Sequence, residues 1–449
     1  MFPALVGLMV LVNAACSGGD GNSDESGDAS PITVPVSEPT RGPSPQAAAE
    51  PASTPVPTDT PTALAAPDEL KGEPATPEAT PTASPRDDRD PDTLEEMAFL
   101  YHTQRGWKTD FSKMSVVISE LIPGGPPRDG IPPIDEPKLV PVPDAPTYMM
   151  DDAPVISVEI GGEAKAYPLA ILMRHEIVND EVGGVPVTVT FCPLCNTSIV
   201  FDRRVDGKVL DFGTSGNLRN SNLIMWDRQT ESWWEQVTGE AIVGEMTGTR
   251  LEFLPAPVIS WGVFRDAFPE GQLLSRDQGF YSDYSTPPYF GYDAADNTPF
   301  LFFGNVDPRL PAMERVVSVT IDGVSVAYPF LLLRDRPAIN DSVNGRELAV
   351  FYVGGTFSPF VGLGTDPTRV GSSGIFDPFV DGRKLTFTFQ DGAIKDDETG
   401  STWNILGQAI EGPMKGSRLE SVVHGNHFWF SWAASFPDTA VRTAADIGG

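Results

Sequence analysis

Alternating apolar and polar residues predict β-structure near the middle of this chain. Between Val155 and Ile160, every second residue is isoleucine or valine (Ile156, Val158, Ile160), and a Gly-Gly pair follows. A period of two residues that ends at glycines is typical of a β-hairpin. Pro168 then favours the first turn of a short helix over 169–177.

The residues that follow continue this alternation of strands and turns. A β-branched run over 185–191 predicts a strand, and 198–203 and 208–212 flank a turn at Val205-Asp206-Gly207. The stretch 261–268 predicts a closing helix. Because strands dominate, we expect an α+β fold that is rich in β-structure.

The same pattern returns 161 residues later. The segment 155–162 recurs as 316–323, and Ala166-Tyr167-Pro168 recurs as Ala327-Tyr328-Pro329. Trp261 and Phe268-Pro269 similarly match Trp429 and Phe436-Pro437. We therefore predict two tandem copies of one domain that pack together, at 152–272 and 313–440, joined by a connecting segment at 273–312.

The N-terminal part has a different composition. Residues 1–15 are almost wholly apolar and end in small residues before Cys16, which predicts an export signal. The stretch resembles a lipoprotein signal, although Asn13 departs from that pattern, so the alternative is a plain cleaved signal. A lipid on Cys16 would tether the protein to the membrane, and we expect it at the cell surface or in the periplasm.

Three further segments complete the predicted organisation. Residues 17–92 are rich in Pro, Thr, Ala and acidic residues, which predicts a disordered stalk. A lead-in segment (93–151) precedes the first copy, and a short tail (441–449) follows the second.

The net charge of −31, from 31 Lys+Arg and 62 Asp+Glu, argues against a nucleic-acid partner.

Candidate chemistry lies where the two copies differ. Cys192 and Cys195, in Cys-Pro-Leu-Cys, align with Val353 and Thr356, and His175 aligns with Arg336. His424 and His427 of the second copy align with Ala256 and Ile259 of the first. If the copies face each other, these residues can form one composite site.

Three interpretations of the cysteine pair stay open. Outside the cytosol, two nearby cysteines commonly form a structural disulfide. The spacing also suits a metal knuckle, with Asn196 in the left-handed conformation and zinc or copper held by Cys192, Cys195 and the histidines His175, His424 and His427. The third interpretation is a redox-active pair, although a strand rather than a helix is predicted after Cys195.

Two weaker candidates involve other polar residues. The stretch 213–227 is rich in small polar residues, and we expect a loop whose Arg219, Asn222 and Asp227 contact a ligand, or else ordinary turns beside a tryptophan core. Glu176, Asp180 and Asp227 are the carboxylates that a hydrolase would use as acid and base. Whether the protein is an enzyme is left undecided.

Several long motifs carry a family resemblance. They include Gly124–Pro132, His175-Glu176-Ile177-Val178-Asn179-Asp180, Phe191–Asn196, Ser221–Arg228 and Phe428–Ala434. Over about 111–442 the chain resembles the domain-of-unknown-function family 3179 of bacteria and archaea. The resemblance implies an exported protein and no established reaction. From the residues themselves, our leading hypothesis is a metal-binding or redox protein that uses Cys192 and Cys195. The alternative is an extracellular binding module with a structural disulfide.

Overall fold

The computed structural model describes residues 105–361 and 368–447. The predicted signal, Cys16, the stalk and the start of the lead-in segment lie outside these residues. No helix within the described ranges is long and apolar enough to cross a membrane.

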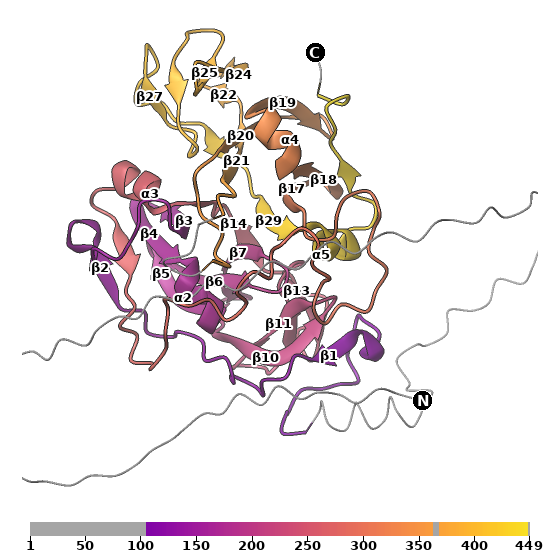
Figure 1. Cartoon of the computed structure of the whole chain (residues 1–449). Helices are drawn as coiled ribbons and strands as arrows, with labels where there is room; N and C mark the ends of the chain where they lie inside the picture. The colour runs from indigo at the N-terminus through magenta and orange to yellow at the C-terminus, as the bar shows by residue number, and fades with distance from the viewer. Residues whose placement is uncertain (1–104, 362–367, 448–449) are drawn as a thin grey trace, which may run out of the picture. The chain divides into compact units, whose positions relative to one another are not determined.

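The first half of the described chain follows the predicted alternation of strands and turns (Figure 1). The predicted hairpin is β3 and β4, the helix after Pro168 is α2, and the closing helix is α3. The elements are η1 (Ile118–Glu120), β1 (Leu121–Pro123), β2 (Leu139–Pro141), η2 (Val142–Asp144), β3 (Pro154–Ile160), β4 (Glu163–Pro168), α2 (Leu169–His175), β5 (Ile177–Val182), β6 (Val185–Cys192), β7 (Thr197–Asp202), β8 (Arg204–Val205), β9 (Lys208–Val209), β10 (Phe212–Arg219), β11 (Asn222–Asp227), β12 (Trp233–Glu235), β13 (Glu240–Val243), β14 (Glu252–Leu254), β15 (Val258–Ser260), α3 (Trp261–Ala267) and β16 (Gln272–Leu274).

The second half repeats this order, so that β3 to β16 have counterparts from β17 to β30. Its elements are β17 (Arg315–Ile321), β18 (Val324–Pro329), α4 (Phe330–Asp335), β19 (Ala338–Val343), β20 (Arg346–Val353), β21 (Ser372–Asp377), β22 (Phe379–Val380), β23 (Arg383–Lys384), β24 (Phe387–Gln390), β25 (Ala393–Asp396), β26 (Thr402–Trp403), β27 (Ala409–Glu411), β28 (Glu420–Ser421), β29 (Gly425–Phe428), α5 (Trp429–Ser435) and β30 (Ala440–Val441). The prevalence of strands over short helices confirms the predicted β-rich α+β class.

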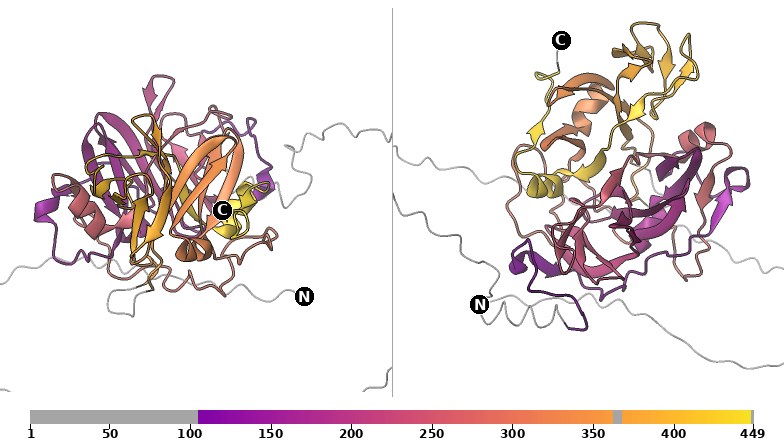
Figure 2. Two further views of the ribbon diagram at one scale, coloured as in Figure 1. Left: turned by 90° about the horizontal axis from the view of Figure 1, so that it is seen from above. Right: turned by 180° about the vertical axis from the view of Figure 1, so that it is seen from behind.

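One sheet runs through both halves (Figure 2). Its order is β30-β18-β17-β29-β7-β6-β5, so β29 of the second half lies between its own β17 and β7 of the first half. The junction is antiparallel and pairs Asn426 with Ser198. This pairing places the histidine-bearing strand of one half directly beside the strand that follows the cysteine pair of the other.

One stretch of the first half differs from the prediction. The polar residues of 213–227 form β10 and β11, two antiparallel strands of the sheet β1-β10-β11-β12-β13, and not a loop. Asn220 and Ser221 have positive φ angles of 51° and 64°, as a tight two-residue hairpin requires. The small polar residues that suggested a loop instead occupy a buried part of the sheet.

The connecting segment covers the main hydrophobic core. Between β16 and β17, the described residues 275–314 form no helix or strand. Tyr289, Tyr292, Leu301 and Phe302 of this segment pack on a core cluster that contains both cysteines. A long connection without regular structure is commonly a lid or a binding loop in compact domains.

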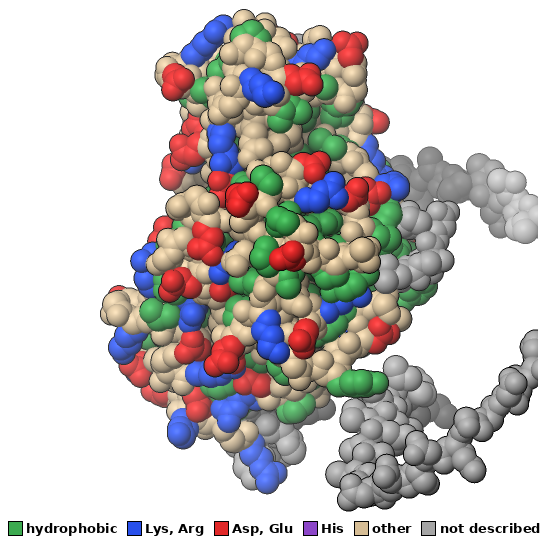
Figure 3. All heavy atoms as spheres, turned by 90° about the vertical axis from the view of Figure 1, so that its left-hand side faces the viewer, with side chains coloured by type: hydrophobic (Ala, Val, Ile, Leu, Met, Phe, Trp, Pro, Cys, Tyr) green, Lys and Arg blue, Asp and Glu red, His purple; other side chains and the backbone are tan. Residues whose placement is uncertain are grey.

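Charges of both signs are mixed on the surface. On the face shown in Figure 3, acidic and basic side chains are interspersed around apolar side chains gathered near the middle. The excess of acidic residues therefore does not form a single acidic patch on that face.

Candidate functional site

The cysteine pair lies in the tight turn between β6 and β7. Cys192 ends β6, and only Asn196 separates Cys195 from the start of β7. Asn196 has a φ of 51°, which confirms the left-handed conformation predicted for it. Both thiols are free and buried, with exposed fractions of 2% for Cys192 and 0% for Cys195. The structure thus holds a buried dithiol rather than a disulfide.

The environment of Cys195 favours a thiolate. Burial by itself raises the pKa of this thiol, but hydrogen bonds from Cys192, Thr197 and Asn222 outweigh burial and lower the pKa. The Asn222 amide donates to the Cys195 sulfur over 3.0 Å. A hydrogen bond that stabilises the charged form is strongest in a buried setting such as this one.

Cys192 has the opposite preference. Burial raises its pKa well above the ordinary thiol value, and the neighbouring Cys195 and Glu176 raise it further. Its sulfur donates to the Ser221 carbonyl over 3.6 Å, which is a contact that only the protonated thiol can make. Cys195 is therefore the more acidic thiol of the pair.

The β10–β11 hairpin positions Asn222. Its Oδ1 accepts from the Val237 backbone N–H over 3.0 Å, so its Nδ2 must point toward Cys195. The same Nδ2 also contacts Gln236 Oε1 over 3.2 Å. Asn222 is fully buried, and these contacts fix the orientation of its amide. Asn222 is a residue that we selected from the sequence, but for a ligand contact rather than for a role beside the cysteines.

Glu176 is the carboxyl group of the site. It is only 7% exposed, and its pKa is raised to about 8 by burial and by the charge of Cys195. It caps the end of α2 with a φ of 58° and a ψ of −30°, an unusual backbone conformation for a residue with a side chain. In the second half, the end of α4 has no such conformation, since Arg336 has a φ of −132°. Backbone strain together with a buried carboxyl is typical of functional positions.

His175 is the last residue of α2, directly before Glu176, and both of its ring nitrogens have hydrogen-bond partners. Its Nδ1 lies 2.7 Å from the Pro132 carbonyl, which can only accept, so the proton sits on Nδ1. Nε2 therefore accepts from the Tyr284 hydroxyl, also over 2.7 Å. Burial lowers the pKa of His175, which keeps the ring neutral. In this arrangement His175 ties the connecting segment to α2.

The two histidines of the second half are His424, directly before β29, and His427, within β29. His427 shares a 3.0 Å hydrogen bond between its Nδ1 and Thr197 Oγ1, and its ring stacks on Trp432. His424 bonds through Nδ1 to the Val422 carbonyl over 2.6 Å. Both histidines line a separate pocket of about 290 Å³. His427 thus contacts Thr197, which lies two residues after Cys195.

The predicted metal ligands are not gathered into one cluster. Within residues 105–361 and 368–447, no group of three or more His, Cys, Asp or Glu side chains is arranged to hold a metal ion. The structure brings together Cys192 and Cys195, and Glu176, Asn222 and Thr197 act on the pair through charge or hydrogen bonds. Sequence reasoning missed Thr197 and gave Glu176 a different role.

The other candidates have structural partners. Arg219 donates to Glu120 and Glu235 over 2.6 and 2.9 Å. Asp227 accepts from the Trp234 indole over 2.9 Å and from Thr230. Asp180 accepts from Lys165 and Tyr167. These contacts place the hydrolase carboxylates in separate networks rather than in one acid–base pair.

Fold and site together define a β-rich α+β protein with a buried dithiol beside a buried carboxyl group. The chain belongs to a family described as protein of unknown function (DUF3179), whose model matches residues 128–439. No curated protein and no solved structure matches the chain. The family resemblance in the sequence is therefore confirmed, and the function must be inferred from the site.

Proposed function

We propose that Cys192 and Cys195 form a redox-active dithiol that exchanges electrons with disulfides. The observation that carries this proposal is the 3.0 Å hydrogen bond from Asn222 to Cys195, which stabilises a thiolate next to a protonated thiol. A thiolate is the nucleophile in thiol–disulfide exchange, and a second thiol close by resolves the mixed disulfide.

The exchange proceeds in two balanced steps. The Cys195 thiolate attacks one sulfur of a substrate disulfide, which forms a mixed disulfide and releases the first substrate thiolate. Cys192 then loses its proton and attacks the Cys195 sulfur, which releases the second substrate thiolate. One disulfide forms in the protein and one is reduced in the substrate. The proton that Cys192 loses is transferred to one of the two substrate thiolates.

Glu176 serves this cycle as a proton-exchange group. Its pKa of about 8 lies close to neutral pH, where a carboxyl group both gives and takes protons readily. Oxidation of the pair removes the Cys195 charge, which is one of the two causes of the raised pKa. Glu176 therefore releases its proton more readily when the pair is oxidised, and it can return that proton when the pair is reduced.

The connecting segment controls access in this proposal. Tyr289 and Tyr292 of this segment pack on the core cluster that contains both cysteines, and burial raises the pKa of each hydroxyl. Ser221, at the tip of the β10–β11 hairpin, also donates to the Phe300 carbonyl over 2.7 Å. A substrate disulfide reaches the sulfurs only when this cover moves, as lids do in many enzymes.

Metal binding is the rival candidate, because the lowered pKa of Cys195 also suits a metal ligand. Soft thiolates favour copper(I) or zinc. In that case the ion would be held by the two sulfurs, and a histidine would have to move to join them.

The proposed location follows from the sequence of the N-terminal part. An apolar segment before Cys16 supports export, and a lipid on Cys16 would hold the protein at the membrane. Disulfide chemistry suits such an oxidising compartment.

The test is a redox titration of the full chain with elemental analysis on the same samples. Protein equilibrated in buffers of set thiol–disulfide potential is quenched, unfolded and alkylated, and the thiols are counted. We expect a two-electron transition whose midpoint falls by about 30 mV per pH unit for the one proton that Cys192 loses with two electrons. The midpoint should fall more steeply just below pH 8, where Glu176 also releases its proton on oxidation.

Variants make the titration specific. Cys192→Ser and Cys195→Ser should each abolish the transition, whereas the matched control Cys16→Ser should keep it. If both thiols stay reduced in the most oxidising buffer, the redox proposal fails. If instead about one zinc or copper ion per chain masks both thiols, the metal candidate replaces it.

A further inference from the structure

A second site lies away from the cysteine pair, in a cavity of about 310 Å³. Four parts of the chain line it: residues 148–154, the start of α2, the connecting segment and the turn at 357–361. The cavity is therefore built from both halves and from the segment that joins them. Its volume lies at the lower end of the range of about 300–1,000 Å³ that is usual for small-molecule sites.

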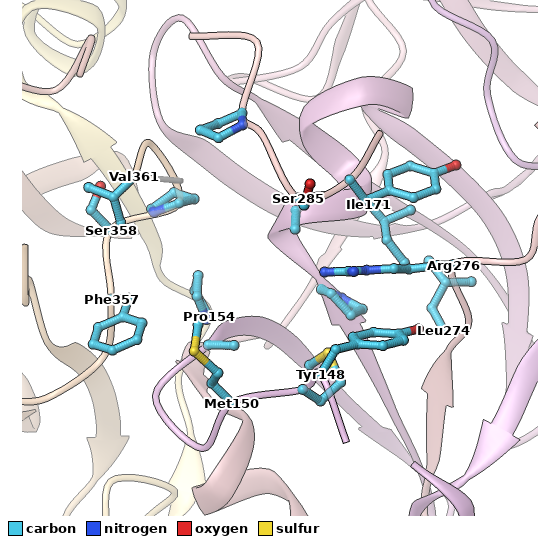
Figure 4. A pocket seen from close by; sticks show the side chains of 17 residues that line it. Tyr148, Met150, Pro154, Ile171, Leu274, Arg276, Ser285, Phe357, Ser358 and Val361 are labelled. Atoms are coloured by element: carbon cyan, nitrogen blue, oxygen red, sulfur yellow. The ribbon is translucent and has the colours of Figure 1, made fainter. Parts of the chain in front are cut away.

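The walls of this cavity are mostly apolar. Figure 4 shows Ile171 and Leu274 on one side, with Met150 and Pro154 below and Phe357 and Val361 opposite. The few polar groups are largely committed, since Ser285 Oγ donates to Asp283 and Ser358 Oγ donates to Asp293. The Tyr284 hydroxyl is likewise held by His175.

Arg276 is the one charged residue among the lining residues that the structure describes. Its guanidinium lies flat over the Tyr148 ring, 4.0 Å from the ring centroid, and its nitrogens point into the cavity (Figure 4). Within the described part of the chain, no carboxylate or carbonyl accepts a hydrogen bond from this guanidinium. Many other arginines have an acidic partner: Arg315, for example, lies 2.7 Å from Asp293.

We propose that this cavity binds a small organic anion, in which a carboxylate is attached to a compact apolar body. The guanidinium presents a planar fork of donors that matches a carboxylate, and Tyr148 holds that fork in place. The apolar walls take up the rest of the ligand. An arginine without an acidic partner in an apolar cavity supplies the one strong donor that such a ligand needs.

The first experiment compares ligands that differ only in charge. Binding of 3-phenylpropanoate to the full chain is measured by calorimetry beside its neutral amide, 3-phenylpropanamide, with indole-3-acetate and 4-methylpentanoate as further carboxylates. We expect at least one carboxylate to bind, the amide of 3-phenylpropanoate to bind at least tenfold more weakly than the acid, and added salt to weaken only the acids. Failure of every carboxylate to bind at millimolar concentration would overturn the proposal, as would equal binding of acid and amide.

The second experiment assigns the charge preference to one residue. Arg276→Gln should remove the difference between acid and amide, while Arg346→Gln, a matched change at an exposed arginine paired with Asp377, should preserve it. Ala170→Phe fills the cavity and should abolish binding of every probe, with folding checked by its thermal transition. Retention of the charge preference in Arg276→Gln would contradict the proposal. The cysteine pair plays no part in this test, so its outcome is independent of the redox titration.

Discussion

The side-chain amide of Asn222 donates a hydrogen bond to the sulfur of Cys195 over 3.0 Å. The two residues are fully buried and come from different hairpins of the first half. The bond links the turn between β6 and β7 to the tip of the β10–β11 hairpin. The folded β10–β11 hairpin therefore helps to lower the pKa of Cys195.

Asn222→Ala should therefore raise the pKa of Cys195. A hydrogen bond to a charged group contributes about 1.5–3 kcal/mol, which corresponds to about one to two pH units. The thiolate absorbance near 240 nm, followed against pH, measures the shift without any need for a reagent to reach the buried sulfur. Asn217→Ala is the matched control, because Asn217 is buried in the same hairpin and bonds to Ser215 instead. An unchanged titration in Asn222→Ala would remove the main support for a thiolate.

Glu176→Gln should stabilise the protein at alkaline pH. The folded-state pKa of Glu176 is raised to about 8 from an ordinary value of 4.5, so the folded state holds this proton more tightly than the unfolded state does. The wild-type free energy of unfolding therefore falls as the pH rises from 4.5 to 8, by at most a few kcal/mol. Glutamine cannot ionise, so the gain of the variant should grow over this interval and level off above it.

Urea unfolding at several pH values measures this gain. Glu163→Gln provides the opposite control, because a hydrogen bond from the Gly183 N–H lowers the pKa of Glu163 in spite of partial burial. That carboxylate contributes stability above its ordinary pKa, so its replacement should cost stability there. Parallel curves for wild type and Glu176→Gln would show that Glu176 does not carry a raised pKa.

The sequence was most informative about local structure. The alternation at Val155–Ile160, the proline before α2 and the β-branched run of β6 each predicted the observed element, because short-range spacing decides which face is buried. The contrast between the two halves also pointed to Cys192 and Cys195. The second half has Val353 and Thr356 at the matching positions, so cysteines are not needed there for the fold.

The remaining site residues depend on contacts that local patterns do not encode. The Tyr284 hydroxyl that occupies His175 comes from the connecting segment, 109 residues away, so the histidine looked available as a ligand. Glu176 acquires its raised pKa only in the folded chain, through burial and through the nearby Cys195. The polar composition of 213–227 suggested a loop, whereas the hydrogen bonds of Asn222 and Ser215 satisfy these side chains inside a sheet.

His427 should make the protein sensitive to acid. Burial and the nearby His424 together lower its folded-state pKa to about 3 from 6.5, with burial the larger cause. Between pH 6.5 and 3 the unfolded state takes up the proton first, so stability is lost as the pH falls through this interval. His427→Gln should flatten the fall in thermal midpoint below pH 6.5 and run parallel to wild type above it. An equally steep fall in the variant would assign acid sensitivity to other groups.

Asp293 should control access to the cysteine pair. Its carboxylate lies 2.7 Å from Arg315 and accepts from Ser358 over 2.5 Å, so it fastens the connecting segment to the second half. Both charged side chains are nearly buried, at 8% exposed for Asp293 and 10% for Arg315. Removing one partner of such an ion pair leaves the other charge buried without compensation, at a cost of about 3–5 kcal/mol.

Asp293→Asn should thus loosen the connecting segment and speed the reaction of Cys192 and Cys195 with a thiol reagent in the folded protein. The rate should rise at least tenfold, because opening of the cover precedes reaction when a thiol is fully buried. Asp277→Asn is the matched control, since Asp277 lies in the same segment but is 87% exposed and only 3.8 Å from Lys138. Comparing both rates with the rate of global unfolding separates local opening from loss of the fold. If Asp293→Asn reacts no faster than Asp277→Asn, residues 275–314 do not gate the dithiol.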